Sequence, residues 1–475
     1  MNTSPTSGEA SPNRLALGSL AMAMLLSAMG VSVANVALPT LAESFSAPFH
    51  AVQWVVISYL LSVTVLIVGA GRLGDMAGHR RVLTAGMIVY TGGALLCGLA
   101  PSLDILIAGR ALQGAGGAVL MALTVALVRG TVGGARIGSA MGLLGTMSAI
   151  GTAAGPTLGG LLIAGPGWRA IFLAMVPLGL LALYLARKHL PEDSPRAEDA
   201  TARLRFDGRG TVLLAVTLAA YSLAVTTGDT GLGRSSGVLL TATLIGAMLF
   251  VIAERRAAAP LVDPASLRDP ALGSALLINL IASAVMMTTL VVGPFYLSQA
   301  LRLPDALVGI AMSVGPVISA LSGVPAGRIV DRFGARKVVI AGLVQMAAGG
   351  FALAALPEPF GLAGYLAGIA VLTPGYQLFL AANNTVVMTD VADHRRGVIS
   401  GMLGLSRNLG LMTGASAMGA VFAAAAGTAD LVAAASGSVA SGMRATFVLA
   451  GCLMLAALVV QLAVRSRDRL SGEVS

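Results

Sequence analysis

The chain has few charges, few aromatic residues and almost no cysteine. Only 11% of its 475 residues are charged, whereas a water-soluble domain carries about 25% charged residues, so the composition excludes a soluble globular protein. Aromatic residues make up 4% of the chain, too few for the base-stacking surfaces of a nucleic-acid-binding protein. The 2 cysteines and 4 histidines lie apart in the sequence and show no metal-ligand spacing. The sequence therefore predicts no metal site, no cofactor and no nucleic-acid partner.

Hydrophobic residues, in contrast, make up 56% of the chain, and the mean hydropathy is +0.87. Apolar runs of about 20 residues recur from end to end, and each can cross a hydrocarbon layer about 30 Å thick. This pattern predicts an all-α polytopic protein of the cell membrane. The first run is too long for the core of a signal peptide, so we expect it to remain as a helix. The predicted helices number fourteen and span 15–39, 52–70, 82–99, 103–128, 137–164, 168–186, 211–227, 237–253, 271–298, 306–325, 338–356, 360–387, 397–425 and 443–464.

The positive charges are distributed unevenly between the predicted loops. With the N-terminus inside, 24 of the 30 lysines and arginines fall in inner loops and tails, and only 4 fall in outer loops. Since inner loops of membrane proteins carry the excess of Lys and Arg, this asymmetry predicts that both termini are cytoplasmic.

An internal repeat relates the two halves of the chain. The stretch GRLGDMAGHRRV at 71–82 reappears as GRIVDRFGARKV at 327–338, each time between the second and third helices of a six-helix set. Duplicated halves are typical of secondary transporters, so we expect two homologous bundles with two inserted helices between them. The predicted units are a cytoplasmic tail at 1–14, a bundle at 15–186, a linker with the inserted helices at 187–270, a second bundle at 271–464 and a tail at 465–475.

The repeated stretch combines glycines, a carboxylate and a basic cluster in one short inner loop. Glycine permits tight turns, and a carboxylate such as Asp75 can accept hydrogen bonds from a facing helix N-terminus. One copy alone would equally fit an ordinary basic inner loop, but two copies in register favour a loop that controls conformation. The residues concerned are Gly71, Asp75, Gly78, Arg80 and Arg81 in the first copy, and Gly327, Asp331, Gly334 and Arg336 in the second.

Together with further motifs, these loops resemble the major facilitator superfamily, and specifically its fourteen-helix drug:proton antiporter branch. The resemblance covers nearly the whole chain and implies proton-coupled export of small amphiphilic compounds by alternating access. In the glycine string of the fifth helix, the four-residue spacing also allows a neighbouring helix to approach closely. The motifs are NVALP at 35–39, QWVVISYLL at 53–61, RxxQGxGxA from Arg110 to Ala118, GxxxGPxxGG with Gly151, Gly155, Pro156, Gly159 and Gly160, WRxIF at 168–172, FDxxG at 206–210, and RNLG at 407–410.

Two arginines lie inside predicted helices. Arg110 is about 10 Å from the outer end of its helix at 1.5 Å per residue, and Arg407 lies near the membrane midplane. A charge at the bilayer centre costs about 2.5–3.5 kcal/mol or more unless it is paired or faces water, so both predict a functional site, with a structural tie to helix carbonyls as the alternative. The polar residues predicted to line a cavity with them are Asn35, Tyr59, Gln113, Asn279, Tyr376, Gln377, Asn383, Asn384 and Asn408.

The chain departs from the branch at one position. Many relatives carry an aspartate in the first helix where this sequence has Gly30, and none of the 21 acidic residues lies clearly inside the predicted membrane interior. Glu43 and Asp104, near outer helix ends, remain as possible proton carriers. The alternatives are a translocator of lipids or lipid-linked precursors and a potential-driven exporter of anionic metabolites. We expect a monomeric transporter in the lipid bilayer and not an enzyme, because no nucleophile–base pair is present.

Overall fold

The computed structural model describes residues 14–131, 137–193, 208–226, 234–257, 269–389, 396–427 and 434–472. Fourteen of its helices are long and apolar enough to span a membrane, which confirms the predicted number, and the described residues contain no strand. Residues 1–13 of the predicted tail at 1–14, and the linker residues 194–207, lie outside the described part.

The N-terminal bundle consists of the helices before the linker, which pack against one another. Its elements are α1 (Arg14–Val36), α2 (Leu38–Phe45), α3 (Phe49–Val52), α4 (Trp54–Ala77), α5 (His79–Gly98), α6 (Leu103–Thr131), α7 (Ile137–Ala164), α8 (Arg169–Leu173) and α9 (Met175–His189).

The C-terminal bundle contains two π-helical segments, η3 and η5, in addition to its α-helices. Its elements are α13 (Pro270–Phe295), η3 (Tyr296–Ala300), α14 (Asp305–Phe333), α15 (Ala335–Ala355), α16 (Pro357–Thr389), α17 (Arg396–Thr413), η5 (Gly414–Met418), α18 (Gly419–Ala426) and α19 (Ser436–Gly472).

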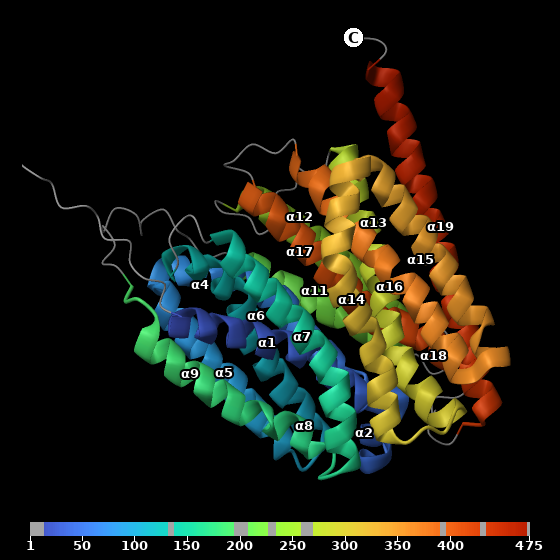
Figure 1. The fold of residues 1–475 in the computed structure, drawn as a ribbon, viewed down its shortest axis with the longest axis horizontal. Coiled ribbons are helices and arrows are strands. Elements are labelled where there is room, and N and C mark those ends of the chain that lie inside the picture. Colours follow the sequence, from blue (N-terminus) through green and yellow to red (C-terminus); the bar gives the residue numbers. More distant parts are fainter. Residues whose placement is uncertain are drawn as a thin grey trace, which may run out of the picture.

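The two bundles lie side by side, and their helices lean apart away from the end that carries α2 (Figure 1). Because α2 joins the first two spans, this end is the outer one in the predicted orientation. The bundles contact each other mainly through α7 with α14 and α4 with α17.

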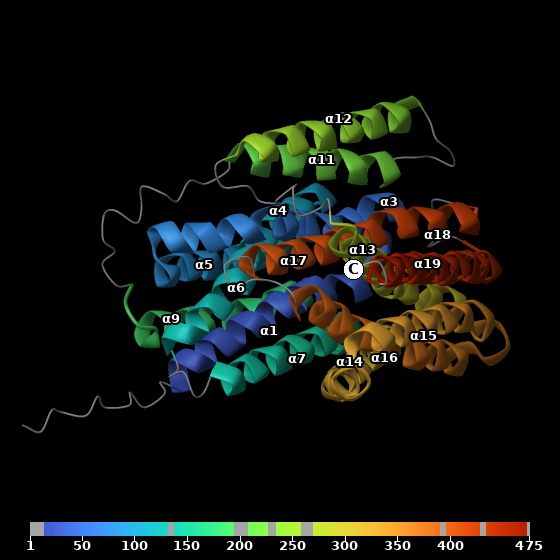
Figure 2. The same cartoon turned by 90° about the horizontal axis from the view of Figure 1, so that it is seen from above.

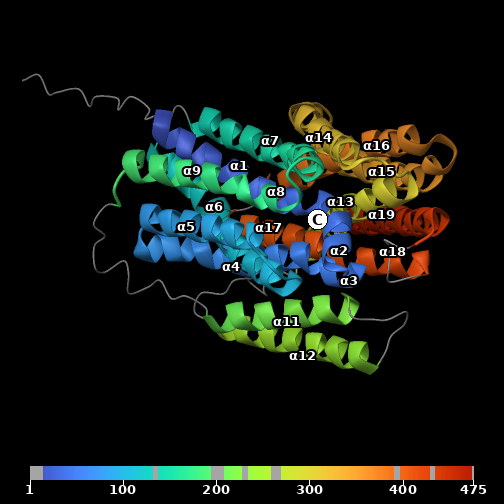
Figure 3. The same cartoon turned by 90° about the horizontal axis from the view of Figure 1, so that it is seen from below.

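The inserted pair, α11 (Gly208–Thr226) and α12 (Arg234–Arg256), packs outside the two bundles (Figures 2 and 3). α11 contacts α4 of the N-terminal bundle and η5 of the C-terminal bundle, so it covers the junction between them. The indole Nε1 of Trp54 in α4 donates a hydrogen bond to Thr226 Oγ1 in α11 at 3.2 Å.

Several predicted helix boundaries differ from the structure, most clearly at the end of the first helix and in the C-terminal tail. The first helix was expected to run to residue 39, but α1 ends at Val36 and α2 begins at Leu38. Pro39 has no N–H to donate to the carbonyl one turn earlier, and this missing hydrogen bond favours the break. At the other end of the chain, α19 continues through Gly472 into the predicted tail, because Arg and Leu are good helix formers.

The signature stretches are also more helical than expected. Gly71 and Asp75 lie within the last turns of α4 and not in a loop, and the chain turns at Gly78 alone, with φ +98°. Gly334 occupies the same place in the second copy, between α14 and α15, with φ +83°. A positive φ is inexpensive only for glycine, so both halves of the chain turn at the same motif position for the same reason.

Glycines allow the helices within each bundle to approach one another closely. A Cβ on Gly93 of α5 would lie 2.6 Å from the backbone nitrogen of Gln113 in α6, and a Cβ on Gly349 of α15 would lie 2.5 Å from Cα of Leu372 in α16. These positions exclude larger side chains because backbone cannot move aside as a side-chain tip can.

We predict that Gly93→Leu separates α5 from α6 and costs about 1–3 kcal/mol or more of stability. Gly92→Leu is the matched control, since a Cβ at Gly92 has nothing within 4 Å. Thermal unfolding of the detergent-solubilised protein measures both effects. Equal melting temperatures for the two variants would contradict the packing described for α5 and α6.

Candidate functional site

Arg110 is the largest fully buried side chain in the described structure, with 0% exposure. Its Nε donates to the Val55 carbonyl of α4 at 2.9 Å, and its Nη2 donates to the Gly30 carbonyl of α1 at 2.8 Å. Its Nη1 donates to Gln113 Oε1, one turn along α6, at 2.7 Å. One side chain therefore joins three helices of the N-terminal bundle.

Tyr59 and Tyr90 lie beside this side chain. We call these tyrosines, together with the three hydrogen-bond acceptors of Arg110, the Arg110 cage. The Arg110 guanidinium carbon lies 4.2 Å from the ring centroid of Tyr59, within the range of a cation–π contact. The hydroxyl of Tyr59 donates to the Ser27 carbonyl at 3.0 Å, and that of Tyr90 donates to the Leu26 carbonyl at 2.5 Å. Both side chains are 0% exposed.

The tyrosine hydroxyls fill the space beside Gly30. A Cβ at this position would lie 2.6 Å from Tyr59 Oη and 2.9 Å from Tyr90 Oη. The hydrogen-bond and ring partners found for Arg110 are all neutral, and Glu43 and Asp104 are exposed and not among them. The structure thus shows the tie to helix carbonyls that was the alternative explanation for Arg110, with tyrosines where an aspartate would stand.

Three of the predicted polar residues form hydrogen bonds to other helices of the C-terminal bundle. Asn279 Nδ2 donates to the Leu403 carbonyl at 3.0 Å, and the Tyr376 hydroxyl lies 3.4 Å from Ser283 Oγ. Gln377 Nε2 bonds Ser319 Oγ of α14.

The remaining predicted polar residues differ in exposure. Asn35 is buried and its Nδ2 donates to the Val31 carbonyl of its own helix at 2.9 Å. Asn383 is 2% exposed, whereas Asn384 is exposed. Arg407 is also exposed, and no hydrogen-bond or ion-pair partner is found for it among the described residues. The two arginines therefore do not form one site.

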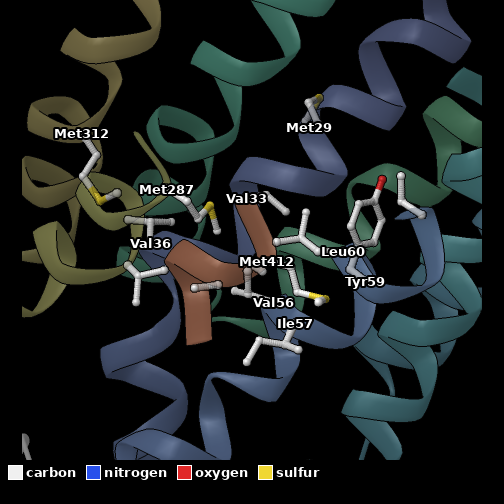
Figure 4. Close-up of a cluster of buried hydrophobic side chains, with 14 of the residues drawn as sticks. Met29, Val33, Val36, Val56, Ile57, Tyr59, Leu60, Met287, Met312 and Met412 are labelled. Carbon is white, nitrogen blue, oxygen red and sulfur yellow. The ribbon is translucent and has the colours of Figure 1, made fainter. Parts of the chain in front are cut away.

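A cluster of apolar side chains lies where the two bundles meet (Figure 4). All of these residues are at most 5% exposed, and three of the four methionines come from the C-terminal bundle. No motif within one helix marks this cluster, because it forms only when five helices converge, and the sequence analysis missed it. This interbundle seam consists of Met29, Val33 and Val36 of α1, Val56, Ile57 and Leu60 of α4, Met287 of α13, Met312 of α14 and Met412 of α17.

The carboxylate at the N-terminus of α5 is Asp193, which the sequence analysis also missed. Its two oxygens accept hydrogen bonds from the backbone nitrogens of Arg80 and Arg81 at 2.9 and 3.1 Å. A negative charge at this end of a helix is favoured by the helix dipole. The side chain of Asp75, which was predicted for such a role, lies outside the described part.

The glycine motif of α7 contacts both bundles. Gly151, Gly155 and Gly159 face α1, where a Cβ on Gly159 would lie 2.7 Å from Val36 Cγ1. Gly160 faces α14 across the bundle boundary, and its Cβ would lie 2.6 Å from the Asp305 carbonyl. α7 therefore packs closely on both partners.

Fourteen spanning helices, a duplicated half and an apolar seam between two bundles define a polytopic membrane transporter. The model of the Major Facilitator Superfamily matches residues 20–415 and 274–474, and the chain belongs to this family. It is a multi-pass membrane protein and not an enzyme.

Its relatives include a multidrug resistance protein and a riboflavin transporter. Multidrug resistance protein Stp of Mycobacterium tuberculosis (strain ATCC 25618 / H37Rv) is 33% identical over 396 residues, which cover 82% of this chain and 72% of Stp. Riboflavin transporter RibZ of Clostridioides difficile (strain 630) is 28% identical over 404 residues, 85% of this chain and 87% of RibZ. The solved structure of a bacterial homologue of the human lysosomal transporter Spinster, inward-facing and unoccupied, matches the fold with a TM-score of 0.68 at 15% identity, covering 96% of this chain and 98% of that one.

We predict that Gly30→Ala displaces the tyrosine hydroxyls and weakens the Arg110 cage, at a cost of about 1–3 kcal/mol. Gly18→Ala, on the same helix, is the control because its Cβ has nothing within 4 Å. Adding Tyr59→Phe to Gly30→Ala removes the nearest oxygen and should restore part of the lost thermal stability. If the Gly30→Ala and Gly18→Ala proteins had the same melting temperature, this tight fit would be disproved.

Proposed function

We propose that this transporter exports small lipophilic compounds that are neutral or anionic, by alternating access of the two bundles. The observation that carries the proposal is the buried charge of Arg110, whose hydrogen-bond partners within the described part of the chain are all neutral. Tyr59 connects this charge to the transport route, since it stacks on Arg110 and also lies beside the interbundle seam (Figure 4).

The positive charge disfavours cationic cargo. At an effective dielectric constant of about 20, the repulsion between Arg110 and a unit positive charge about 12 Å away is about 1.4 kcal/mol. This energy corresponds to a factor of about ten in affinity. No acidic side chain belongs to the seam to offset this repulsion. The penalty doubles for a permanent dication.

The seam also indicates broad selectivity. Methionine is flexible and polarizable, and methionine-rich surfaces can repack around ligands of different shape. The names of the relatives, a multidrug resistance protein and a riboflavin transporter, agree with small organic cargo and do not specify one compound.

An anionic cargo supplies its own driving force. An inside-negative potential drives the export of an anion, and each exported negative charge gains about 2.3 kcal/mol per 100 mV. Among the described acidic residues, Glu254 is the most buried at 2% exposure, but it lies on α12 of the inserted pair, outside both bundles. We therefore propose that transport does not require a proton carrier beside Arg110.

The test compares the anion lucifer yellow with the dication propidium in energised inside-out membrane vesicles, against vesicles that lack the protein. We expect protein-dependent uptake of lucifer yellow to exceed that of propidium by about a hundredfold, because the repulsion of about 1.4 kcal/mol for one charge doubles for a dication. Robust propidium uptake that is abolished by Glu43→Gln or Asp104→Asn would contradict the proposal and identify a working carboxylate at the outer helix ends.

A further inference from the structure

One side chain of the N-terminal bundle crosses the bundle boundary at the outer end. Gln53, which immediately precedes α4, is 2% exposed, and its Nε2 donates to the carbonyl of Ala415 at 2.9 Å. Because the acceptor belongs to η5 of the C-terminal bundle, this hydrogen bond exists only while the outer ends are together.

The acceptor lies in an unusual backbone segment. Gly414–Met418 forms a π-helical turn between α17 and α18, and such turns are often found at functional sites. A π-helical turn interrupts the regular i→i+4 ladder, so a carbonyl there can accept from outside the helix. The next residue, Gly419, packs directly on Gln53 Nε2, and a Cβ at this position would collide with it.

The second π-helical segment takes part in a weaker crossing contact. Gln299 of η3 (Tyr296–Ala300) donates to Glu43 Oε1 at 3.4 Å, but this pair is exposed. An exposed hydrogen bond competes with water and contributes little, whereas breaking a buried one leaves a polar group unsatisfied. The Gln53 contact is therefore the stronger of the two.

Aromatic rings lie close to Gln53. Phe49 of α3 meets Phe295 of α13 edge-on at 4.8 Å between centroids, and Phe422 of α18 lies 5.8 Å from Phe49 and 6.3 Å from Phe295. The three rings are at most 2% exposed. Like the Gln53 hydrogen bond, they join the two bundles at their outer end, and a hydrogen bond is stronger in such an apolar environment than in water.

The two bundles lie closer together at the outer end and lean apart toward the inner end (Figure 1). At the outer end, a Cβ on Gly309 of α14 would lie 2.5 Å from the Pro156 carbonyl of α7. Toward the inner end, Gly145 of α7, Gly323 of α14 and Gly404 of α17 have nothing within 4 Å of a Cβ. The structure is therefore closed on the outer side, and the hydrogen bond from Gln53 to Ala415 is present in this closed state.

We propose that Gln53 is the latch that holds the outer face closed, with the Ala415 carbonyl of the π-helical turn as its receptor. The inference rests on alternating access as proposed above but not on the identity of the cargo. Opening to the outside must break this hydrogen bond and separate the three rings, so the bond sets the balance between the two states.

The experiment measures that balance without any substrate, by double electron–electron resonance in nanodiscs. Spin labels at each end of the molecule report the distance between bundles, in a protein in which both native cysteines are replaced. The labelled variants are Ser44→Cys with Ala435→Cys at the outer end and Ala85→Cys with Lys337→Cys at the inner end, in a Cys97→Ala and Cys452→Ser background.

We expect Gln53→Leu, which keeps the size but cannot donate, to raise the outward-open population about threefold to tenfold, the range of one buried hydrogen bond. Gly419→Ala should act in the same direction, because its Cβ displaces Gln53 without changing it. Gln299→Ala is the matched control and should leave both distances unchanged.

Distance distributions like those of the unsubstituted protein in Gln53→Leu would overturn the proposal. If Gln53→Leu does not fold, Gly419→Ala decides the question by the same distances. An equal shift in Gln299→Ala would also overturn it, since the latch would then not be specific to Gln53. Each of these results is independent of the dye measurements that test the cargo.

Discussion

The architecture of the N-terminal bundle depends on one buried guanidinium for which no counter-ion is found among the described residues. Arg110 is bonded by carbonyls of α1 and α4 and by Gln113, and these acceptors distribute its charge over three helices. A buried cation of this kind is costly if any partner is lost. The small residue at position 30 and the two tyrosine hydroxyls beside it follow from this arrangement, because no space remains for a side chain between them.

The first turn of α4 connects this cage to the rest of the molecule. Within five consecutive residues, Gln53 bonds the C-terminal bundle, Trp54 bonds the inserted pair, and the Val55 carbonyl accepts from Arg110. The next two residues, Val56 and Ile57, belong to the interbundle seam. A movement of α4 during transport would therefore act on the cage, the seam and the outer contact together, which gives the proposed latch its position in the cycle.

Much of the fold could be predicted from the sequence because membrane spans and duplicated motifs are local signals. The number of spanning helices and the family are confirmed, and the turns at Gly78 and Gly334 lie within the repeated motif. Other features arise from contacts between distant segments. The pairing of Asp193 with the N-terminus of α5 joins residues more than 100 positions apart. No sequence pattern near Asp193 predicts this contact.

The candidate site shows the same limit. A lone arginine within a helix predicts a special role, but the neutral or acidic nature of its partners depends on which carbonyls and side chains the neighbouring helices present. The interbundle seam likewise has no signature in a single helix, because it forms only where the two bundles meet.

We infer that transport is driven by the membrane potential, without a proton carrier beside Arg110. Lucifer yellow uptake into energised inside-out vesicles tests it most directly, with nigericin used to collapse the pH gradient and valinomycin with potassium used to collapse the potential. If the potential drives export, uptake persists with nigericin and is lost with valinomycin. Uptake that is lost with nigericin and persists with valinomycin would contradict it.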